Sequence, residues 1–285
     1  MILKDIEPAP SLKKYIQCYR IVHFEFNGFS EIPFKLCSPK PEICLHFILE
    51  GTLSIEYINS TKLTFSKPVL AGQFTSVYKR QSSKKIVDFQ IVFQPSALFF
   101  LAGIPGSEVT DQYKPATEVF SNCIDLIHER LMEANTINEK ISIANEFVIY
   151  LINCSNKATH LIDETIHKII NFEDRIGMNG IASESCLCTK QFKRKFHERI
   201  GVNPKAFLRI ARFNRAYNIK NKYPEIDWLR IAINCGYYDY QHLVRDYKDF
   251  TSMAPTEFHT AETQSPECLL GMTGEIYRSR AGMIK

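Results

Sequence analysis

The feature that most constrains this chain is an internal repeat in its C-terminal half. A pattern of aromatic, basic and proline positions recurs at an offset of 51 residues. The recurring pairs are Phe192 and Leu243, Arg194 and Arg245, Phe196 and Tyr247, Pro204 and Pro255, and Phe207 and Phe258. Upstream, Ile181-Ala182 recurs as Ile231-Ala232 at an offset of 50, so the second copy has one more residue in its turn. A repeat of this kind indicates one structural unit built twice.

Each copy has the pattern of a short helix, a turn and a longer helix. In the first copy the short helix begins at Ile181-Ala182, the turn lies near 186–188, and the longer helix runs from about Thr189 to Arg199. In the second copy the predicted parts are a helix from Trp228 to Asn234, a turn at Gly236 and a helix from about Asp239 to Asp249. A glycine-containing turn between two helices is typical of a helix-turn-helix unit.

The two longer helices carry similar polar side chains on their outer faces. Helical spacing puts apolar residues on the inner faces, namely Phe192, Phe196 and Ile200 in the first helix and Leu243, Tyr247 and Phe250 in the second. The outer faces carry Lys190, Lys193, Arg194 and His197 in the first helix and Gln241, Val244, Arg245 and Lys248 in the second. Arg and Lys match guanine edges, Gln matches adenine, and Val can contact a thymine methyl. Both faces are therefore suited to the major groove of DNA.

Basic residues are concentrated around the repeat. Between Cys188 and Lys222 there are eleven Lys and Arg residues and one Glu, a net charge of +10, whereas the whole chain carries +4. Charged runs are usually solvated helix faces. Such concentrated repulsion nevertheless favours a polyanionic partner. Double-stranded DNA is the favoured partner, and an acidic protein is the alternative.

A single helix is expected to join the two units. Asn203 is a good N-cap residue and Pro204 suits the first helical position, so a helix is predicted from Pro204 to about Asn221. Its arginines at a spacing of three are Arg209, Arg212 and Arg215. One continuous helix would hold the two units at a fixed separation, as two successive major-groove segments about 34 Å apart require.

The N-terminal half has the pattern of a small β domain followed by helices. Strands are predicted at 16–26, 43–49, 53–58, 62–65 and 85–93, helices at 118–133 and 138–153, and a polar linker at 155–158. The predicted fold class is α+β. A small β-barrel or sandwich with trailing helices occupies 1–155, an all-α domain of two helix-turn-helix units occupies 159–260, and a loosely ordered tail occupies 261–285.

Composition and cysteine usage are typical of a cytoplasmic protein of two domains. A chain of 285 residues is long for one domain. It has no run of about 18 apolar residues, so no membrane span is predicted, and its first residues lack the order of a secretion signal. Nine scattered cysteines fit reduced thiols. Cys186 and Cys188 lack a second pair of ligands for zinc and are expected to be buried core thiols.

These motifs resemble the AraC/XylS family of transcription regulators. The first unit matches in Ile181-Ala182, Phe192-x-Arg194-x-Phe196 and Gly201-x-Asn203-Pro204-x-x-Phe207, and the second in Ile231-Ala232-x-x-x-Gly236-Tyr237-x-Asp239, Leu243-x-Arg245-x-Tyr247-Lys248 and Pro255-x-x-Phe258. The resemblance covers roughly residues 160 to 260. It implies a seven-helix DNA-binding domain with both longer helices in adjacent major grooves.

The resemblance and the outer faces together predict the DNA contacts. The base-contacting candidates are Lys190, Gln191, Lys193, Arg194, Tyr240, Gln241, His242, Val244 and Arg245. The candidates for the DNA backbone are His197, Arg199, Lys205, Arg209, Arg212 and Lys248. Three residues depart from the family pattern, namely Cys188, Tyr237 and Tyr247. Cys188 stands where the family commonly has a capping serine, which should weaken the helix start by about 1 kcal/mol.

The N-terminal half is similar, less specifically, to the cupin-like sensor domains often joined to such DNA-binding domains. Pro41-Glu42-x-x-x-His46 is its most suggestive feature, although a lone His on a strand is more often a packed, hydrogen-bonded residue than a ligand. No His-x-His pair, phosphate loop or nucleophile elbow is present, so no cofactor, metal or catalytic residue is predicted.

We therefore expect a sequence-specific, non-enzymatic transcription regulator that a small-molecule or partner signal controls at its N-terminal domain. RNA polymerase and a second copy of the chain, as a homodimer, are candidate further partners. The alternative is a cupin-like enzyme that processes a small molecule and carries an accessory DNA-binding domain.

Overall fold

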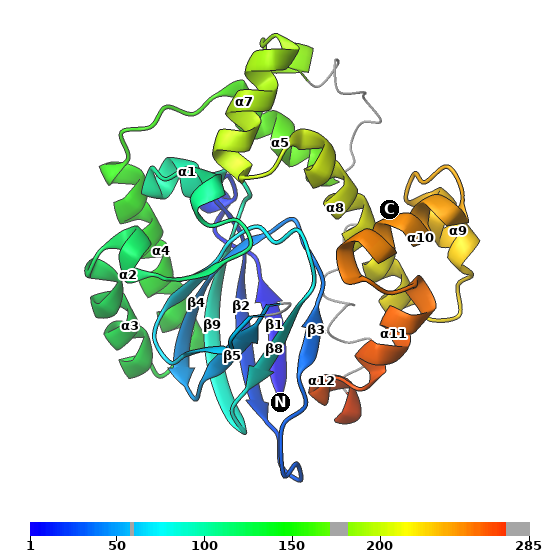
Figure 1. Cartoon of the computed structure of the whole chain (residues 1–285). Coiled ribbons are helices and arrows are strands. Elements are labelled where there is room, and N and C mark those ends of the chain that lie inside the picture. The colour runs from blue at the N-terminus through cyan, green and yellow to red at the C-terminus, as the bar shows by residue number, and fades with distance from the viewer. Residues whose placement is uncertain (58–59, 172–181, 272–285) are drawn as a thin grey trace.

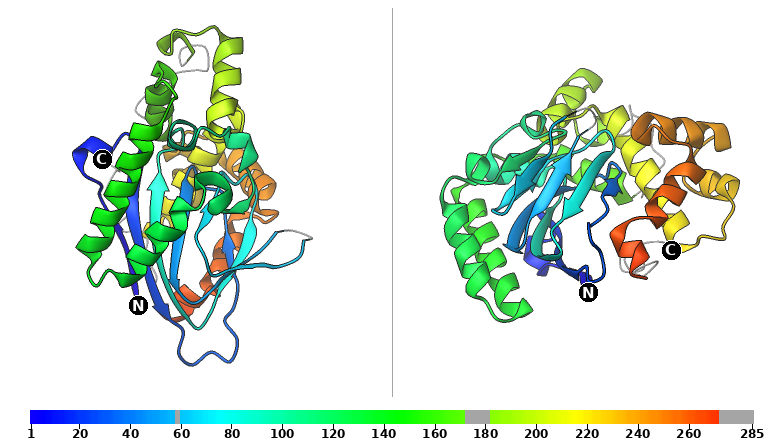
Figure 2. Two further views of the ribbon diagram at one scale, coloured as in Figure 1. Left: turned by 90° about the vertical axis from the view of Figure 1, so that its left-hand side faces the viewer. Right: turned by 60° about the horizontal axis from the view of Figure 1, so that its bottom comes forward.

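The computed structural model describes residues 1–57, 60–171 and 182–271. A β-rich N-terminal lobe (residues 1–155) lies beside a helical C-terminal lobe (residues 161–271), as Figure 1 shows. Helices of the N-terminal lobe cover one side of its sheets, and the helical lobe lies on the opposite side (Figure 2). The two regions that the sequence separates at 155–158 are therefore in direct contact.

The described strands of the N-terminal lobe form two antiparallel sheets. One has the order β1-β2-β9-β4-β7-β10, with bounds Ile2–Ile6, Ile16–Glu25, Lys85–Phe93, Ile43–Glu50, Val69–Ala71 and Tyr113–Pro115. The other has the order β3-β8-β5-β6, with bounds Lys35–Cys37, Tyr78–Ser82, Leu53–Glu56 and Leu63–Phe65. Within the residues that the structure covers, these strands do not close into one hydrogen-bonded ring. The lobe is therefore a sandwich of two sheets, and the closed-barrel alternative is wrong.

The central strands β4 and β9 are apolar on both faces because both faces are covered. Phe47 and Ile91 pack in the core beneath the helices, whereas Cys44 and Val92 pack between the two sheets. Burial on both sides is the reason that these strands appear in the sequence as nearly continuous apolar runs.

The helices of this lobe, apart from η1 (Pro10–Leu12) between β1 and β2, follow the last long strand. Their bounds are Ala97–Ala102 for α1, Gly106–Glu108 for η2, Thr117–Phe120 for α2, Cys123–Glu133 for α3 and Ile137–Cys154 for α4. The predicted helix at 118–133 is interrupted at Ser121, whose φ of 56° lies in the left-handed region. The helix α4 begins with a capping box between Thr136 and Glu139, close to the predicted start at 138.

The helical lobe contains the predicted repeat. Its described helices are α5 (Leu161–Asn171), α7 (Thr189–Ile200), α8 (Pro204–Lys222), α9 (Trp228–Asn234), α10 (Tyr240–Thr251), α11 (Pro255–Thr263) and α12 (Pro266–Leu269). One apolar cluster contains Phe192 and Phe196, and a second contains their repeat partners Leu243 and Tyr247. The long helix α8 contributes Phe207 to the first cluster and Phe213 to the second, so one helix joins the two units as predicted. Ile181 lies outside the described residues.

Two expectations from the sequence are wrong in detail. The tail was expected to be loosely ordered from 261, but α11 continues to Thr263 and α12 follows it, with Glu262 and Glu267 both buried. Helices this short have too few turns to produce a periodic pattern, and their partners lie far away in the sequence. Cys186 and Cys188 are exposed free thiols and not core residues.

Candidate nucleic-acid interface and inter-lobe cavity

The outer face of α7 is exposed and cationic. Its exposed polar residues are Lys190, Gln191, Lys193, Arg194 and His197. In the described part of the chain, Lys190, Lys193 and Arg194 form no salt bridge with a carboxylate, so their charges are available to a partner. Cys188 is the N-cap residue and its side chain makes no capping hydrogen bond, as the departure from the family pattern predicted.

The outer face of α10 is also polar, and this helix has a capping hydrogen bond that α7 lacks. Asp239 caps the helix by accepting a hydrogen bond from the His242 backbone N–H at 2.7 Å. Gln241, Arg245 and Lys248 are exposed, whereas Tyr240, His242 and Val244 are half-buried. The His242 ring nitrogen Nε2 lies 3.3 Å from Arg212 Nη2, which makes this side chain part of the contact between α8 and α10.

The arginines of α8 pack against α10 through a buried carboxylate. Asp246 is 1 % exposed; it accepts hydrogen bonds from Arg209 Nε at 2.8 Å and Arg212 Nη2 at 3.2 Å, and Arg209 also pairs with Asp249. Although burial lowers the pKa of Arg209, its hydrogen bonds to Asp249 and Asp246 raise that pKa overall. These contacts orient α10 on α8, and we name the set Arg209, Arg212 and Asp246 the arginine clamp.

The candidates for the DNA backbone thus fall into two groups. His197, Lys205 and Lys248 are exposed. Arg199 is 4 % exposed; its Nε donates to Asp163 at 2.8 Å, and its guanidinium lies 4.8 Å from the centre of the Phe99 ring. In this structure Arg199, Arg209 and Arg212 therefore face carboxylates of the protein, which differs from the expectation that they face phosphates.

The N-terminal lobe contacts the C-terminal ends of both α7 and α10. A Cβ atom at Gly106 in η2 would lie 2.5 Å from the Gly201 nitrogen and 2.5 Å from the Ile200 carbonyl carbon, just beyond α7. Gly201 has a φ of 87°, a left-handed conformation that favours glycine. At the matching end of α10, the Val77 N–H donates to the Phe250 carbonyl at 2.8 Å. One lobe therefore contacts both units at nearly equivalent positions of the repeat.

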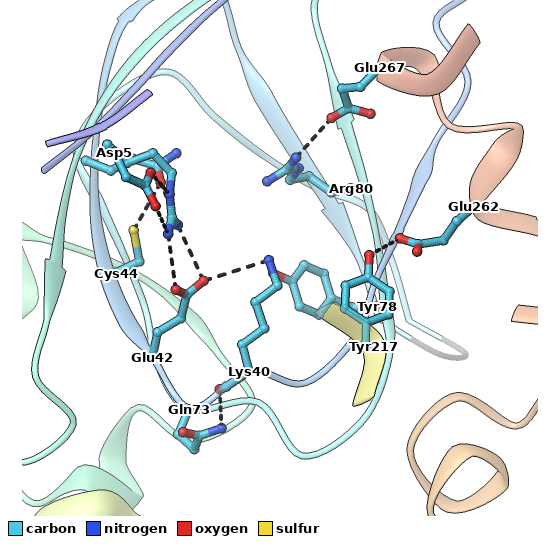
Figure 3. Close-up of polar contacts among 12 residues, drawn as sticks. Asp5, Lys40, Glu42, Cys44, Gln73, Tyr78, Arg80, Tyr217, Glu262 and Glu267 are labelled. Atoms are coloured by element: carbon cyan, nitrogen blue, oxygen red, sulfur yellow. Dashed lines mark hydrogen bonds and ion pairs between the residues drawn. The ribbon is translucent and has the colours of Figure 1, made fainter. Parts of the chain in front are cut away.

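A cavity of about 90 Å³ lies between the lobes. Its walls come from β3 and β8 of the smaller sheet, from the larger sheet, and from Tyr217 of α8 and Glu267 of α12. The polar side chains at this junction face one another in Figure 3. Because residues from both lobes line it, a molecule bound there would contact both at once.

Ion pairs line this cavity. Arg20 Nε donates to Asp5 at 2.8 Å, and Arg20 Nη2 lies 3.3 Å from Glu42. On the opposite wall, Glu267 accepts from Arg80 Nη2 at 3.3 Å (Figure 3). Although burial raises the pKa of Glu267, the charges of Lys35 and Arg80 bring it below its ordinary value. Glu267 is therefore a buried carboxylate in its ionised form.

His46 is a packed and hydrogen-bonded core residue, as the sequence predicted. It is buried, and its Nδ1 lies 2.8 Å from Asp88 Oδ2. Burial lowers the pKa of His46, but Cys44 and Asp88 raise it to about 10 overall. A protonated imidazole offers no lone pair to a metal. In the described ranges, no group of three or more His, Cys, Asp or Glu side chains is arranged to hold a metal ion.

The sequence patterns did not predict the residues that join the two lobes. Glu267, Lys35, Arg80, Gly106 and Val77 belong to no motif, and the hydrogen bond between Arg80 and Glu267 spans 187 positions. Only an alignment of related sequences could have linked such positions, because no local pattern does.

Two family models match separate parts of the chain. Residues 181–261 match the model of a family described as "Helix-turn-helix domain". Residues 4–115 match the model of a domain of unknown function (DUF6597). No curated protein matches the chain. Across the residues that the structure describes, no helix is both long enough and apolar enough to cross a membrane.

Several solved structures are similar to this chain over most of its length. A crystal structure of ToxT from Vibrio cholerae has a TM-score of 0.48 and 13% identity and covers 85% of this chain and 98% of that chain. A structure of unsaturated fatty acid bound ToxT from Vibrio cholerae has a TM-score of 0.44 and 13% identity and covers 84% and 94%. The AraC-like transcriptional activator CuxR has a TM-score of 0.28 and 11% identity and covers 76% and 86%.

Proposed function

We propose that this chain is a DNA-binding transcription regulator of the AraC type, whose α7 and α10 contact DNA bases through their outer faces. Support comes from the match of residues 181–261 to a helix-turn-helix domain. The base-contacting residues of this proposal are Lys190, Gln191, Lys193 and Arg194 on α7 and Gln241, Val244 and Arg245 on α10. Tyr240 and His242 have weaker support, because Tyr240 packs against the second apolar cluster and the His242 ring lies 3.3 Å from Arg212 Nη2. His197, Lys205 and Lys248 are the proposed phosphate contacts.

One observation carries this proposal. The exposed cations on the outer faces of α7 and α10 have no carboxylate partner in the described residues, whereas the arginines on the inner side of α8 are paired. Charges left without a partner on both units at matching positions are what a polyanion would neutralise.

Selection of bound DNA sequences tests the proposal. The full chain should enrich a sequence with two half-sites, and Arg194→Ala and Arg245→Ala should each relax base preference in a different half-site by about 1–3 kcal/mol. Lys14→Ala, an exposed change of the same charge in the N-terminal lobe, is the control and should leave base preference unchanged. Absence of any enriched sequence for the wild-type chain would contradict the proposal.

We also propose that the N-terminal lobe (residues 1–155) controls the DNA-binding domain (residues 159–260) by binding a small molecule in the inter-lobe cavity. Support comes from the contacts of that lobe with the ends of both α7 and α10 and from the cavity walls that both lobes share. A coupling of 1–3 kcal/mol is typical of allosteric proteins and corresponds to about a 5- to 150-fold change in DNA affinity.

The measurement is the affinity of the full chain for its selected DNA, made with and without compounds that raise its unfolding temperature. A compound that stabilises the chain and leaves DNA affinity unchanged would contradict control through this cavity. The expectations of a cytoplasmic, non-enzymatic protein, and of RNA polymerase or a second copy as partners, stay predictions.

A further inference from the structure

The short helix α12 places a carboxylate on cations of the other lobe. Lys35 and Arg80 are direct partners in the pairing of β3 with β8, so their side chains leave the sheet side by side. Glu267 lies 3.3 Å from Arg80 Nη2 and 3.6 Å from Lys35 Nζ, and its side chain is 5 % exposed. Figure 3 shows the carboxylate directed from α12 toward Arg80. The helical lobe thus places a buried carboxylate in the wall of the cavity.

This arrangement has the chemistry of a binding site for a carboxylate. Two cations from neighbouring strands converge on one carboxylate, whose charge they hold in its ionised form. Both distances exceed the 2.7–2.9 Å of good charge-assisted hydrogen bonds. A ligand carboxylate that approaches Lys35 and Arg80 more closely would therefore bind these cations better than Glu267 does. Ser38 lines the same cavity and is buried, and its Oγ has no hydrogen-bond partner among the described residues. A ligand oxygen could accept the hydrogen bond that this hydroxyl lacks.

We propose that Glu267 is an internal occupant of an acid-binding site, and that a small carboxylate ligand replaces it on Lys35 and Arg80. The inference rests on the proposed control through the inter-lobe cavity and names the chemistry of its ligand. Replacement frees α12 from the N-terminal lobe, and α12 follows α11 and α10 directly in the chain. The ligand therefore acts on the contact that joins the second helix-turn-helix unit to that lobe.

The size of the cavity limits the ligand. A space of about 90 Å³ holds about six water molecules, since each needs roughly 15 Å³ by this measure. A short carboxylic acid fits such a space, and a long acyl chain does not.

Competition for the same cations gives a direct test. Binding of propionate and benzoate to the full chain is measured by calorimetry, with propionamide, benzamide and inorganic phosphate as comparison ligands. Glu267→Gln keeps the shape of the side chain and removes its charge, so either carboxylate should bind this variant about 10-fold or more tightly than it binds the wild type. Glu225→Gln, the same change at an exposed position, should bind as the wild type does.

Two further variants distinguish competition for the cations from a general effect of the substitutions on folding. Glu267→Asp retains the charge on a shorter side chain and should give an intermediate affinity. Arg80→Gln in the Glu267→Gln background should abolish the gain. Equal binding of amides and acids, binding of phosphate without binding of carboxylates, or equal affinities in wild type and Glu267→Gln would each overturn the inference.

The outcomes also separate this inference from the proposed control. Amides that bind and change DNA affinity would leave control through the cavity intact and remove the acid-binding site. Carboxylates that bind Glu267→Gln more tightly but leave DNA affinity unchanged would confirm the acid site and contradict the control.

Discussion

The two helix-turn-helix units have the same pattern but are held in place differently. In the second unit, Asp239 caps α10 and the arginine clamp fixes it to α8. In the first unit the positions that match Asp239 and Asp246 are Cys188 and Lys195, so neither the cap nor the clamp can form.

Contacts from outside the first unit take their place. The C-terminal end of α7 packs against η2 at Gly106, and Arg199 lies against the Phe99 ring of α1. The N-terminal lobe also touches the second unit, through Val77 and through the pairs of Lys35 and Arg80 with Glu267, but that unit has its own ion pairs in addition. The comparison indicates that the position of α7 depends on the N-terminal lobe, whereas α10 also has the arginine clamp. Under the proposed control, the first unit is therefore the more sensitive point.

Removal of the clamp should have the largest effect. Asp246→Ala leaves Arg209 and Arg212 beside an apolar side chain in a mostly buried site, and loss of one partner of a buried ion pair typically costs about 3 kcal/mol or more. Thermal and denaturant unfolding would measure this loss. Asp249→Ala is the matched control, because that side chain is 58 % exposed and a surface pair contributes about 0–1 kcal/mol. Equal effects of the two changes would show that the second unit does not depend on its clamp.

A methyl group at Gly106 should separate the N-terminal lobe from the first unit. The added Cβ would meet backbone atoms of Ile200 and Gly201 at 2.5 Å, too close to be absorbed by a side-chain movement. Forced overpacking of this kind costs about 1–3 kcal/mol. Hydrogen exchange should become faster in the amides of α7 while those of α10 keep their protection.

The matched control for that change lies in the second unit. Gly236 has a φ of 79° and open space around it, so Gly236→Ala strains the backbone there but creates no contact with the N-terminal lobe. If Gly106→Ala left exchange in α7 unchanged, the dependence of the first unit on the N-terminal lobe would be refuted.

Local structure in the helical lobe could be predicted from the sequence because its signals are local. Trp228–Asn234 and Pro204–Lys222 were expected within a residue of their observed bounds, since a cap or a turn marks each end. The buried faces of α7 and α10 followed from helical spacing alone. Strands such as β3 and β8 were missed, because three to five residues without strong alternation produce no signal.

The pairing of charges could not be predicted in the same way. The count of basic residues between Cys188 and Lys222 treats every cation as equal. In the folded chain, Arg199 pairs with Asp163, and Arg209 and Arg212 pair with Asp246, and both carboxylates lie outside the counted segment. Net charge along a sequence therefore overstates the charge that a folded surface presents.

Restoring the missing cap of α7 should make the start of this helix as stable as that of α10. Cys188 has the extended backbone of an N-cap residue but makes no capping bond, so Cys188→Ser should stabilise the chain by about 1 kcal/mol. Asp239→Ala should cost a similar amount in the second unit. Both changes in the free energy of unfolding would be measured from the denaturant midpoints, provided that the dependence of that free energy on denaturant concentration stays the same. A neutral result for Cys188→Ser would mean that contacts with the N-terminal lobe, and not the helix start, limit the stability of α7.

The smallest expected effect separates a cation proposed to contact phosphate from one that holds two helices of the protein together. Lys205 is exposed at the start of α8 and has no carboxylate partner among the described residues, so Lys205→Ala should reduce the slope of log affinity against log salt by about 0.9. Arg209 lies on the same helix and has the same charge, but two carboxylates already neutralise it, so Arg209→Ala should leave the slope unchanged while lowering stability. Binding measured from low to physiological salt distinguishes the two. A reduced slope for Arg209→Ala would mean that the arginine clamp opens on DNA and that the second unit is not as rigidly held as its ion pairs imply.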